Sequence, residues 1–159
     1  MEGDSLFIII IVFCIVMSAY FSATETAFSS LNRIRIKNMA EKGNKRAALV
    51  LRLSNNYDGL LSTILIGNNI VNITSASLAT VVFVRYLGEE AGASISTVVT
   101  TIVVLIFGEI SPKSIAKENA ETFSMFSAPI LNVFMKILTP VNFLFKQWKK
   151  LLSKIIKAE

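Results

Sequence analysis

The chain has 159 residues, of which 53% are hydrophobic, and a mean hydropathy of +0.60, which excludes an ordinary soluble domain and places it in the membrane class. It has no histidine and one cysteine, Cys14, so Cys/His zinc sites and internal disulfides are excluded. The net charge of +5 comes from basic residues that flank apolar segments, which favours a membrane surface over nucleic acid as the partner.

Residues 5–29 predict the first membrane-spanning helix. The stretch 6–17 is continuously apolar, and the small and polar residues after it can continue the helix. At 1.5 Å per residue this segment is long enough to cross a bilayer. Two acids, Glu2 and Asp4, precede it in place of a basic region, so we expect a retained span and not a cleaved signal peptide.

The segment 33–53 changes character. It carries seven basic residues against one acid, and its apolar residues recur at helical spacing. This pattern predicts a helical hairpin, or a broken amphipathic helix, on an anionic membrane face. Gly43 and Asn44 are the expected break.

Residues 60–87 predict the second span, 88–92 a short turn, and 95–107 a third span that runs into the sequence GEISPK. Pro112 lacks an amide hydrogen and disfavours helix in the residue before it, so we expect the helix to end or kink there.

The rest of the chain is apolar but interrupted by Pro129, Lys136 and Pro140, which predicts a half-buried belt of helices along the membrane face. Residues 139–159 predict a basic amphipathic helix with Trp148 at an interfacial position. The expected organisation is therefore an all-α membrane domain of three spans with juxtamembrane helices over 1–138, followed by the basic helix over 139–159.

The basic residues predict the topology. Seven lie between the first and second spans, whereas Arg85 is the one basic residue near the turn between the second and third. Eight follow the third span: Lys113, Lys117, Lys136, Lys146, Lys149, Lys150, Lys154 and Lys157. The positive-inside rule then places the N-terminus outside and the C-terminus in the cytosol of a multi-pass plasma (cell inner) membrane protein.

Because three spans are few for a transport pathway, we expect a homodimer.

Two carboxylates, Glu25 and Glu109, lie within or at the end of apolar stretches. A charge at membrane depth costs roughly 2.5–3.5 kcal/mol on insertion scales, so such a group needs a proton, a cation or a buried partner. Ser18, Ser22 and Glu25 share one helical face, which suits either a hard cation or close helix packing. Glu25 could instead pair with Arg33 or Arg35.

Polar residues also gather on the other two predicted spans. Asn68, Asn69 and Asn72 follow Gly67 and indicate a site or a local unwinding, with interhelical hydrogen bonding as the alternative. In the sequence 108–113, carbonyls freed near Pro112 and the carboxylate of Glu109 are suitable cation ligands.

The alternative for the segment 108–113 is a helix end with Glu109 paired to Lys113. Without histidine, a Ser-His-Asp set is impossible, and no phosphate-binding glycine loop is present. We therefore expect no enzyme activity.

Three ordered segments carry a resemblance to a known family. The runs SAYFSATETAFSSLNRIRIKNMAEKGNKRA, LLSTILIGNNIVNI and FGEISPKSIAKENAE closely resemble the transmembrane domain of the CNNM/CorC family. The resemblance implies three spans, a juxtamembrane belt, a dimer and Mg²⁺ efflux coupled to Na⁺ entry. It also implies that cytosolic CBS-type domains accompany this domain in the full-length protein.

The resemblance further implies a largely dehydrated Mg²⁺ held by oxygens of all three spans. The matching motif positions are Ser18, Ser22, Asn69, Gly108, Glu109 and Ser111. Of these, Gly108 is expected to contribute a backbone carbonyl, and Glu25, Asn68 and Asn72 are expected to line the path or a Na⁺ site. Two alternatives stay open: a Mg²⁺ sensor or scaffold that regulates another transporter, and a structural anchor whose polar residues only join helices.

Overall fold

The structure is a computed structural model that describes residues 2–156, and the predicted all-α class is confirmed: no strand occurs within this range. Lys157, the last of the basic residues used to predict the topology, lies outside the described residues.

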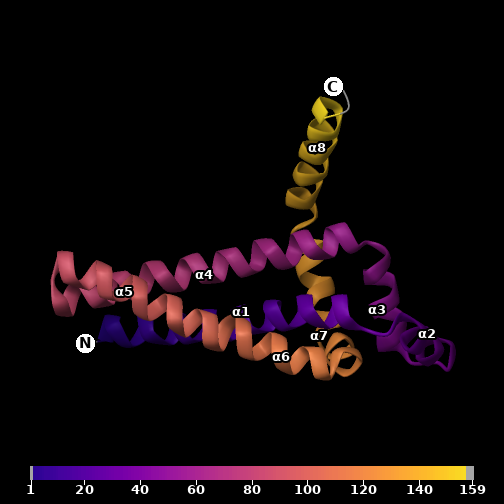
Figure 1. Cartoon of the computed structure of the whole chain (residues 1–159), viewed down its shortest axis with the longest axis horizontal. Helices are drawn as coiled ribbons and strands as arrows, with labels where there is room; N and C mark the ends of the chain where they lie inside the picture. The colour runs from indigo at the N-terminus through magenta and orange to yellow at the C-terminus, as the bar shows by residue number, and fades with distance from the viewer. Residues whose placement is uncertain (1, 157–159) are drawn as a thin grey trace.

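Three long helical rods lie side by side along the long axis of the molecule (Figure 1). The first two are α1 (Glu2–Ser30) and α4 (Tyr57–Leu87). The third consists of α5 (Glu89–Val103), the π-helical segment η1 (Val104–Ile110) and α6 (Ser111–Glu118). Each rod is long and apolar enough to cross a membrane, which confirms the three predicted spans.

Short helices cover one end of the bundle, where the predicted hairpin is confirmed. It consists of α2 (Arg33–Glu41) and α3 (Lys45–Asn55). The chain reverses at Gly43, whose φ of 92° is readily adopted only by glycine. The next residue, Asn44, begins α3 by accepting hydrogen bonds from the backbone N–H groups of Arg46 and Ala47 at 3.0 and 3.1 Å.

The turn between α4 and α5 is tighter than predicted. Only Gly88 interrupts the helices, with a φ of 84°, whereas the prediction extended the turn to Gly92. Gly92 instead lies in the first turns of α5, where a Cβ atom would approach the Cα of Val84 to 2.5 Å. This glycine therefore permits close contact between the two helix backbones and does not form the turn.

The third helix does not end at Pro112, one of the two outcomes predicted there, because the rod continues to Glu118 as a single candidate span. The residues before the proline form the π-helical segment, in which the N–H of Ser111 bonds to the carbonyl of Ile106, five residues earlier. We attribute the continuity to this wider turn, since a proline in a regular α-helix clashes with the carbonyl four residues before it. The expected unwinding near Gly67 is also absent: α4 is helical throughout its length.

The main core lies at the end of the bundle that carries α2 and α3 and includes Phe21, Phe28, Ile36, Leu60 and Leu131. Leu131 belongs to α7 (Ala120–Ile137), a helix that packs against α1, α3 and α4.

The last helix, α8 (Thr139–Ile156), bends by 73° from α7 and projects sideways away from the bundle (Figure 1). None of its residues is buried, and its exposed residues include Trp148 and several lysines. By length and composition, α7 and α8 together pass for a fourth membrane-spanning segment that is broken at this bend.

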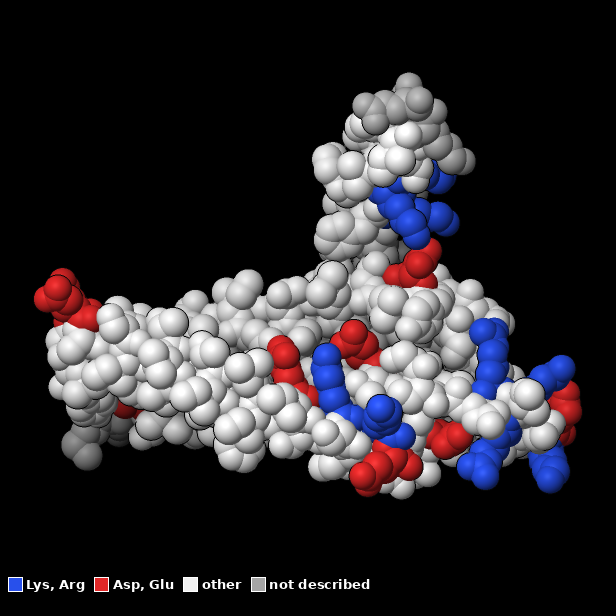
Figure 2. Space-filling model, viewed as in Figure 1, with Lys and Arg blue, Asp and Glu red and all other residues white. Residues whose placement is uncertain are grey.

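Charge is distributed unequally along the bundle. Figure 2 shows basic side chains gathered on α8 and at the end that carries α2 and α3, and a mixed group of acids and bases beside that end. The stretch from this group to the acids at the α4–α5 turn is uncharged on this face. At that far end, Arg85 forms an ion pair with Asp4, and the hydroxyl of Tyr86 donates to the same carboxylate at 3.2 Å. The lone basic residue of the far end is therefore neutralised by an acid of α1.

Candidate cation site

The three spans meet at Ser18. Its side chain is fully buried, and its hydroxyl donates to the Oδ1 atom of Asn68, on α4, at 3.0 Å. From the third rod, Gly108 faces the same hydroxyl: a Cβ atom on this glycine would lie 2.8 Å from the Ser18 Oγ. One residue from each span thus contributes to a single junction, which we call the Ser18 junction (Ser18, Asn68 and Gly108).

The segment that carries Gly108 has the unusual geometry found in the third rod. Gly108 is buried within η1, four residues before Pro112. In an α-helix the Gly108 carbonyl would accept from the N–H of residue 112, which a proline lacks. Single π-helical turns frequently occur at functional sites, and this one places a glycine, whose backbone can be approached closely, against the polar face of α1.

One helical turn from Ser18, Ser22 is the buried hydroxyl that lacks a partner. The Ser22 side chain is fully buried, and its Oγ makes no hydrogen bond within the described residues. A buried polar atom without a partner costs about 1–3 kcal/mol. Such an atom in a folded protein calls for an explanation, of which a bound ion or water is the usual one.

Glu109 follows Gly108 in η1 and is half-buried. Across residues 2–156 its carboxylate forms no ion pair; Lys113, the partner considered in the sequence, instead lies 3.4 Å from the Oε2 atom of Glu25. The alternative in which Glu109 and Lys113 pair along one helix is therefore wrong, and so is the pairing of Glu25 with Arg33 or Arg35. An ion pair between α1 and α6 was not predicted, since the sequence does not show which faces of these helices meet.

The structure does not bring the other two predicted ligands to the Ser18 junction. Asn69 is exposed on α4, and its amide donates to the carbonyl of Leu65 at 2.9 Å. Ser111 is exposed at the start of α6. Asn68, which was predicted to line the ion path or a Na⁺ site, takes the place expected of Asn69. The two asparagines are 100° apart around the helix, so only the packing of α4 against α1 could distinguish them.

Asn72 lines a smaller cavity between α4 and α5. This cavity has a volume of about 270 Å³, and its other polar lining residues are Thr80, Ser96, Thr97, Thr100 and Thr101. The Oδ1 atom of Asn72 is buried and makes no hydrogen bond among the described residues, while the Thr80 and Ser96 hydroxyls lie 3.2 Å apart. Hydroxyl and amide oxygens therefore continue along the bundle beyond the Ser18 junction.

The atoms at the Ser18 junction that could coordinate a cation are oxygens. No group of three or more histidine, cysteine, aspartate or glutamate residues that could hold a metal occurs in the described part of the chain. The groups that meet there are the Ser18 hydroxyl, the Asn68 amide oxygen and the Gly108 backbone. The Ser22 hydroxyl lies one helical turn along α1, and Glu109 follows Gly108 in the sequence. Hard cations such as Mg²⁺, Ca²⁺ and Na⁺ prefer such oxygen ligands, whereas softer metals select nitrogen and sulfur.

Comparison with known proteins agrees with this architecture. The model of the Cyclin M transmembrane N-terminal domain family (CNNM) matches residues 9–159. A UPF0053 protein of Haemophilus influenzae is 45% identical over 153 residues, which cover 96% of this chain and 36% of that protein. The UPF0053 inner membrane protein YfjD of Escherichia coli is 40% identical over 140 residues, or 88% of this chain and 32% of its own length.

A chloroplastic DUF21 domain-containing protein of Arabidopsis thaliana is 37% identical over 105 residues, which cover 66% of this chain and 16% of that protein. The chain thus spans about a third or less of the length of these relatives. The match to the family model extends over all three spans, the juxtamembrane helices and the basic helix α8. This multi-pass membrane protein therefore belongs to the family of Cyclin M transmembrane N-terminal domains.

Proposed function

We propose that this chain is the membrane domain of a Mg²⁺ transporter that exports Mg²⁺ in exchange for Na⁺. The observation that carries the proposal is the unpaired Ser22 hydroxyl, buried one turn from a junction to which all three spans contribute polar groups. A Mg²⁺ ion bound there would be the transported substrate. The coupling to Na⁺ and the direction of transport are what the family resemblance implies.

One rearrangement would bring Asn69 of the predicted ligand set to the Ser18 junction, and it would leave the exposed Ser111 outside. Ser18 and the Gly108 backbone already face each other between α1 and η1, and Ser22 is buried one turn further along α1. Asn68 is the residue of α4 that contacts the Ser18 hydroxyl. Asn69 would take its place if α4 rotated by one residue, or about 100°. Because Mg²⁺ gives up its waters reluctantly, the carboxylate of Glu109 is proposed to offset the cost of dehydration.

Assembly and orientation belong to the same proposal. The basic end of the bundle would face the cytosol and its anionic lipids, the N-terminus would lie outside, and two copies would form a homodimer. The charge distribution in Figure 2 supports this orientation, since lysines and arginines crowd the end formed by α2 and α3. Cytosolic CBS-type domains are proposed to accompany this domain in the full-length protein.

The test is Mg²⁺ flux in proteoliposomes of the purified chain, with and without an opposing Na⁺ gradient. Flux that rises with the Na⁺ gradient is expected. If no flux occurs while Mg²⁺ still raises the melting temperature, the chain binds the ion without transporting it. That outcome would overturn the transport proposal and favour the sensor.

Replacement of Ser22 by alanine separates a ligand from a residue that only joins helices. Without Mg²⁺, the variant is expected to be as stable as the wild type, or more stable by up to about 1 kcal/mol, because a buried unpaired hydroxyl is removed. The increase in melting temperature on Mg²⁺ addition is expected to shrink strongly. Thermal unfolding with and without Mg²⁺ measures both effects, with Ser29→Ala, at an exposed position of the same helix, as the control. An unchanged response to Mg²⁺ would remove Ser22 from the site.

A further inference from the structure

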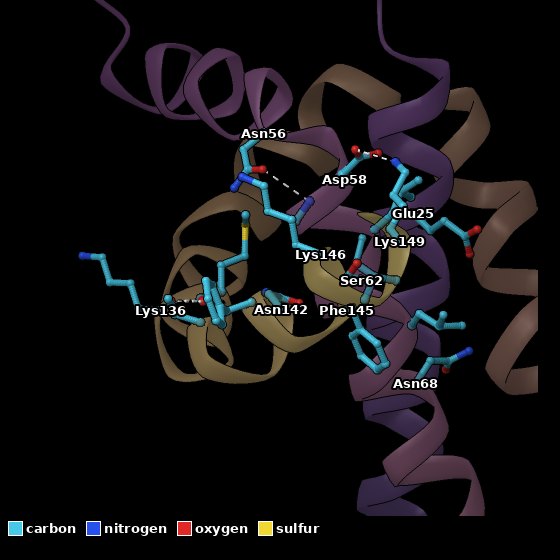
Figure 3. A pocket seen from close by; sticks show the side chains of 17 residues that line it. Glu25, Asn56, Asp58, Ser62, Asn68, Lys136, Asn142, Phe145, Lys146 and Lys149 are labelled. Carbon is cyan, nitrogen blue, oxygen red and sulfur yellow. Dashed lines mark hydrogen bonds and ion pairs between the residues drawn. The ribbon is translucent and has the colours of Figure 1, made fainter. Parts of the chain in front are cut away.

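A groove separates α4 from the last two helices at the basic end of the bundle. It has a volume of about 810 Å³ and is lined by the first part of α4, the end of α7 and the first part of α8 (Figure 3). Its lining on α4 runs from Asn56 to Asn68, a distance of about 18 Å along the helix at 1.5 Å per residue. We call this cavity the α4–α8 groove.

The two ends of the α4–α8 groove differ in chemistry. Figure 3 shows Lys146 and Lys149 extending toward the end that carries Asn56 and Asp58, whereas Phe145 extends the other way, toward Asn68. The apolar lining residues include Leu61, Ile64, Leu65, Met135 and Phe143. The groove thus combines a basic end with an apolar wall along a membrane-spanning helix.

The charge left unpaired in the groove is positive. Lys149 lies 3.0 Å from the carboxylate of Asp58, and Glu25 pairs with Lys113 of α6. The two remaining charged lining residues, Lys136 and Lys146, form no ion pair with any described residue. A groove that binds cations is expected to be lined by more acidic than basic side chains. In this groove, the two charged side chains that have no partner among the described residues are both lysines.

The position of the groove relative to the bilayer follows from α8. This helix projects sideways away from the bundle, has no buried residue and exposes Trp148, an aromatic residue typical of the membrane interface, beside its lysines. The lysine end of the groove therefore lies at the depth of lipid headgroups. The wall formed by Phe145 and Leu65, whose side chain is 62% exposed, lies at the depth of acyl chains.

We propose that the α4–α8 groove binds one anionic phospholipid of the cytosolic leaflet. Its phosphate is held by Lys146 and by Lys136, whose flexible side chain is turned away from Lys146 in Figure 3 and would have to swing back over the groove. An acyl chain follows α4 past Leu61 and Leu65 toward Phe145. Basic pockets between membrane helices on the cytosolic side bind anionic headgroups in this way. The proposal rests on the membrane location of the chain and on the cytosolic side proposed for its basic end, and it does not depend on Mg²⁺ transport.

The experiment measures retention of phosphatidylglycerol by native mass spectrometry of the detergent-solubilised protein, with phosphatidylcholine as the zwitterionic comparison. Three proteins are compared: the wild type, the groove variant Lys136→Gln/Lys146→Gln, and the control variant Lys150→Gln/Lys154→Gln. The control removes the same charge from exposed positions of α8 that do not line the groove. We expect the wild type and the control to retain one phosphatidylglycerol per chain in preference to phosphatidylcholine. The groove variant is expected to lose roughly tenfold or more in apparent affinity.

Equal loss in both double variants would overturn the proposal, since it would show attraction by the overall charge and not by a site. Stabilisation of the wild type by glycerol phosphate as strong as that by phosphatidylglycerol would also overturn it, because a free phosphate would then suffice. A dimer that retains no lipid and in which α8 cross-links to α4 of the second copy would assign the groove to that copy instead. A groove variant that has lost the lipid but keeps its Mg²⁺ response would separate this site from the cation site.

Discussion

Replacement of Glu109 by glutamine is expected to reduce Mg²⁺ flux in proteoliposomes to the background level. The substitution keeps the size of the side chain and removes the carboxylate of η1, which follows Gly108 of the Ser18 junction directly in the sequence and forms no ion pair with any described residue. Without this charge, the remaining neutral oxygens have to replace the hydration shell of Mg²⁺, which this ion releases reluctantly. The apparent affinity for Mg²⁺ is expected to fall at least tenfold, or about 1.4 kcal/mol, as measured by the dependence of the melting temperature on Mg²⁺.

The matched control for this substitution is Glu118→Gln. Glu118 is an exposed acid at the end of the same rod, so the change in net charge is identical while the Ser18 junction is untouched. Normal flux is expected in the control. If Glu109→Gln transported Mg²⁺ as well as the control does, Glu109 would not be a ligand, and the carboxylate of Glu25 would become the residue to test.

Replacement of Gly108 by alanine is expected to disrupt the Ser18 junction by steric conflict. The new Cβ atom would lie 2.8 Å from the Oγ and 3.3 Å from the Cβ of Ser18. Ser18 is fully buried and bonded to Asn68, so its hydroxyl can yield only by breaking that bond or by moving α1 away from η1. Overpacking of this kind costs about 1–3 kcal/mol, and the variant is expected to lose both stability and its response to Mg²⁺.

The control for the steric effect is Gly3→Ala, because a Cβ atom at this helical position meets no atom within 4 Å. Thermal unfolding of the two variants with and without Mg²⁺ measures the difference. A Gly108→Ala variant as stable as the control, with an undiminished Mg²⁺ response, would show that η1 does not approach α1 as closely as the structure indicates.

The membrane-spanning helices and the break between α2 and α3 could be predicted from the sequence because they depend on local properties. Apolar length alone determines which segments can cross a bilayer, and α1, α4 and the third rod follow from it. The hairpin of α2 and α3 follows from Gly43 and from Asn44, a residue that caps a helix start through its own side chain. The basic residues of 33–52 indicated the surface character of these helices in the same local way.

The helix end allowed for at Pro112 and the turn predicted at Gly92 are absent because both residues act through neighbours. Proline usually ends a helix, but here a π-helical segment provides room for it and the rod continues. Glycine usually indicates a turn, but Gly92 permits the backbone of α5 to approach Val84 of α4. Each residue type has a known local effect, and the packing of two segments determines whether that effect appears.

The sequence by itself determined the fold class, the number of spans, the amphipathic hairpin and the kinds of polar residue at membrane depth, since each of these follows from composition and periodicity. Only the tertiary structure decided that Asn68 and not Asn69 contacts Ser18 and that Glu25 pairs with Lys113. It also decided that the buried Ser22 hydroxyl has no hydrogen-bond partner among residues 2–156. The physical reason is that these facts depend on the direction in which each side chain points around its helix axis. Adjacent residues of a helix point 100° apart, and the side that faces a neighbouring span is fixed by close packing among helices, here by glycines such as Gly108 that let backbones approach.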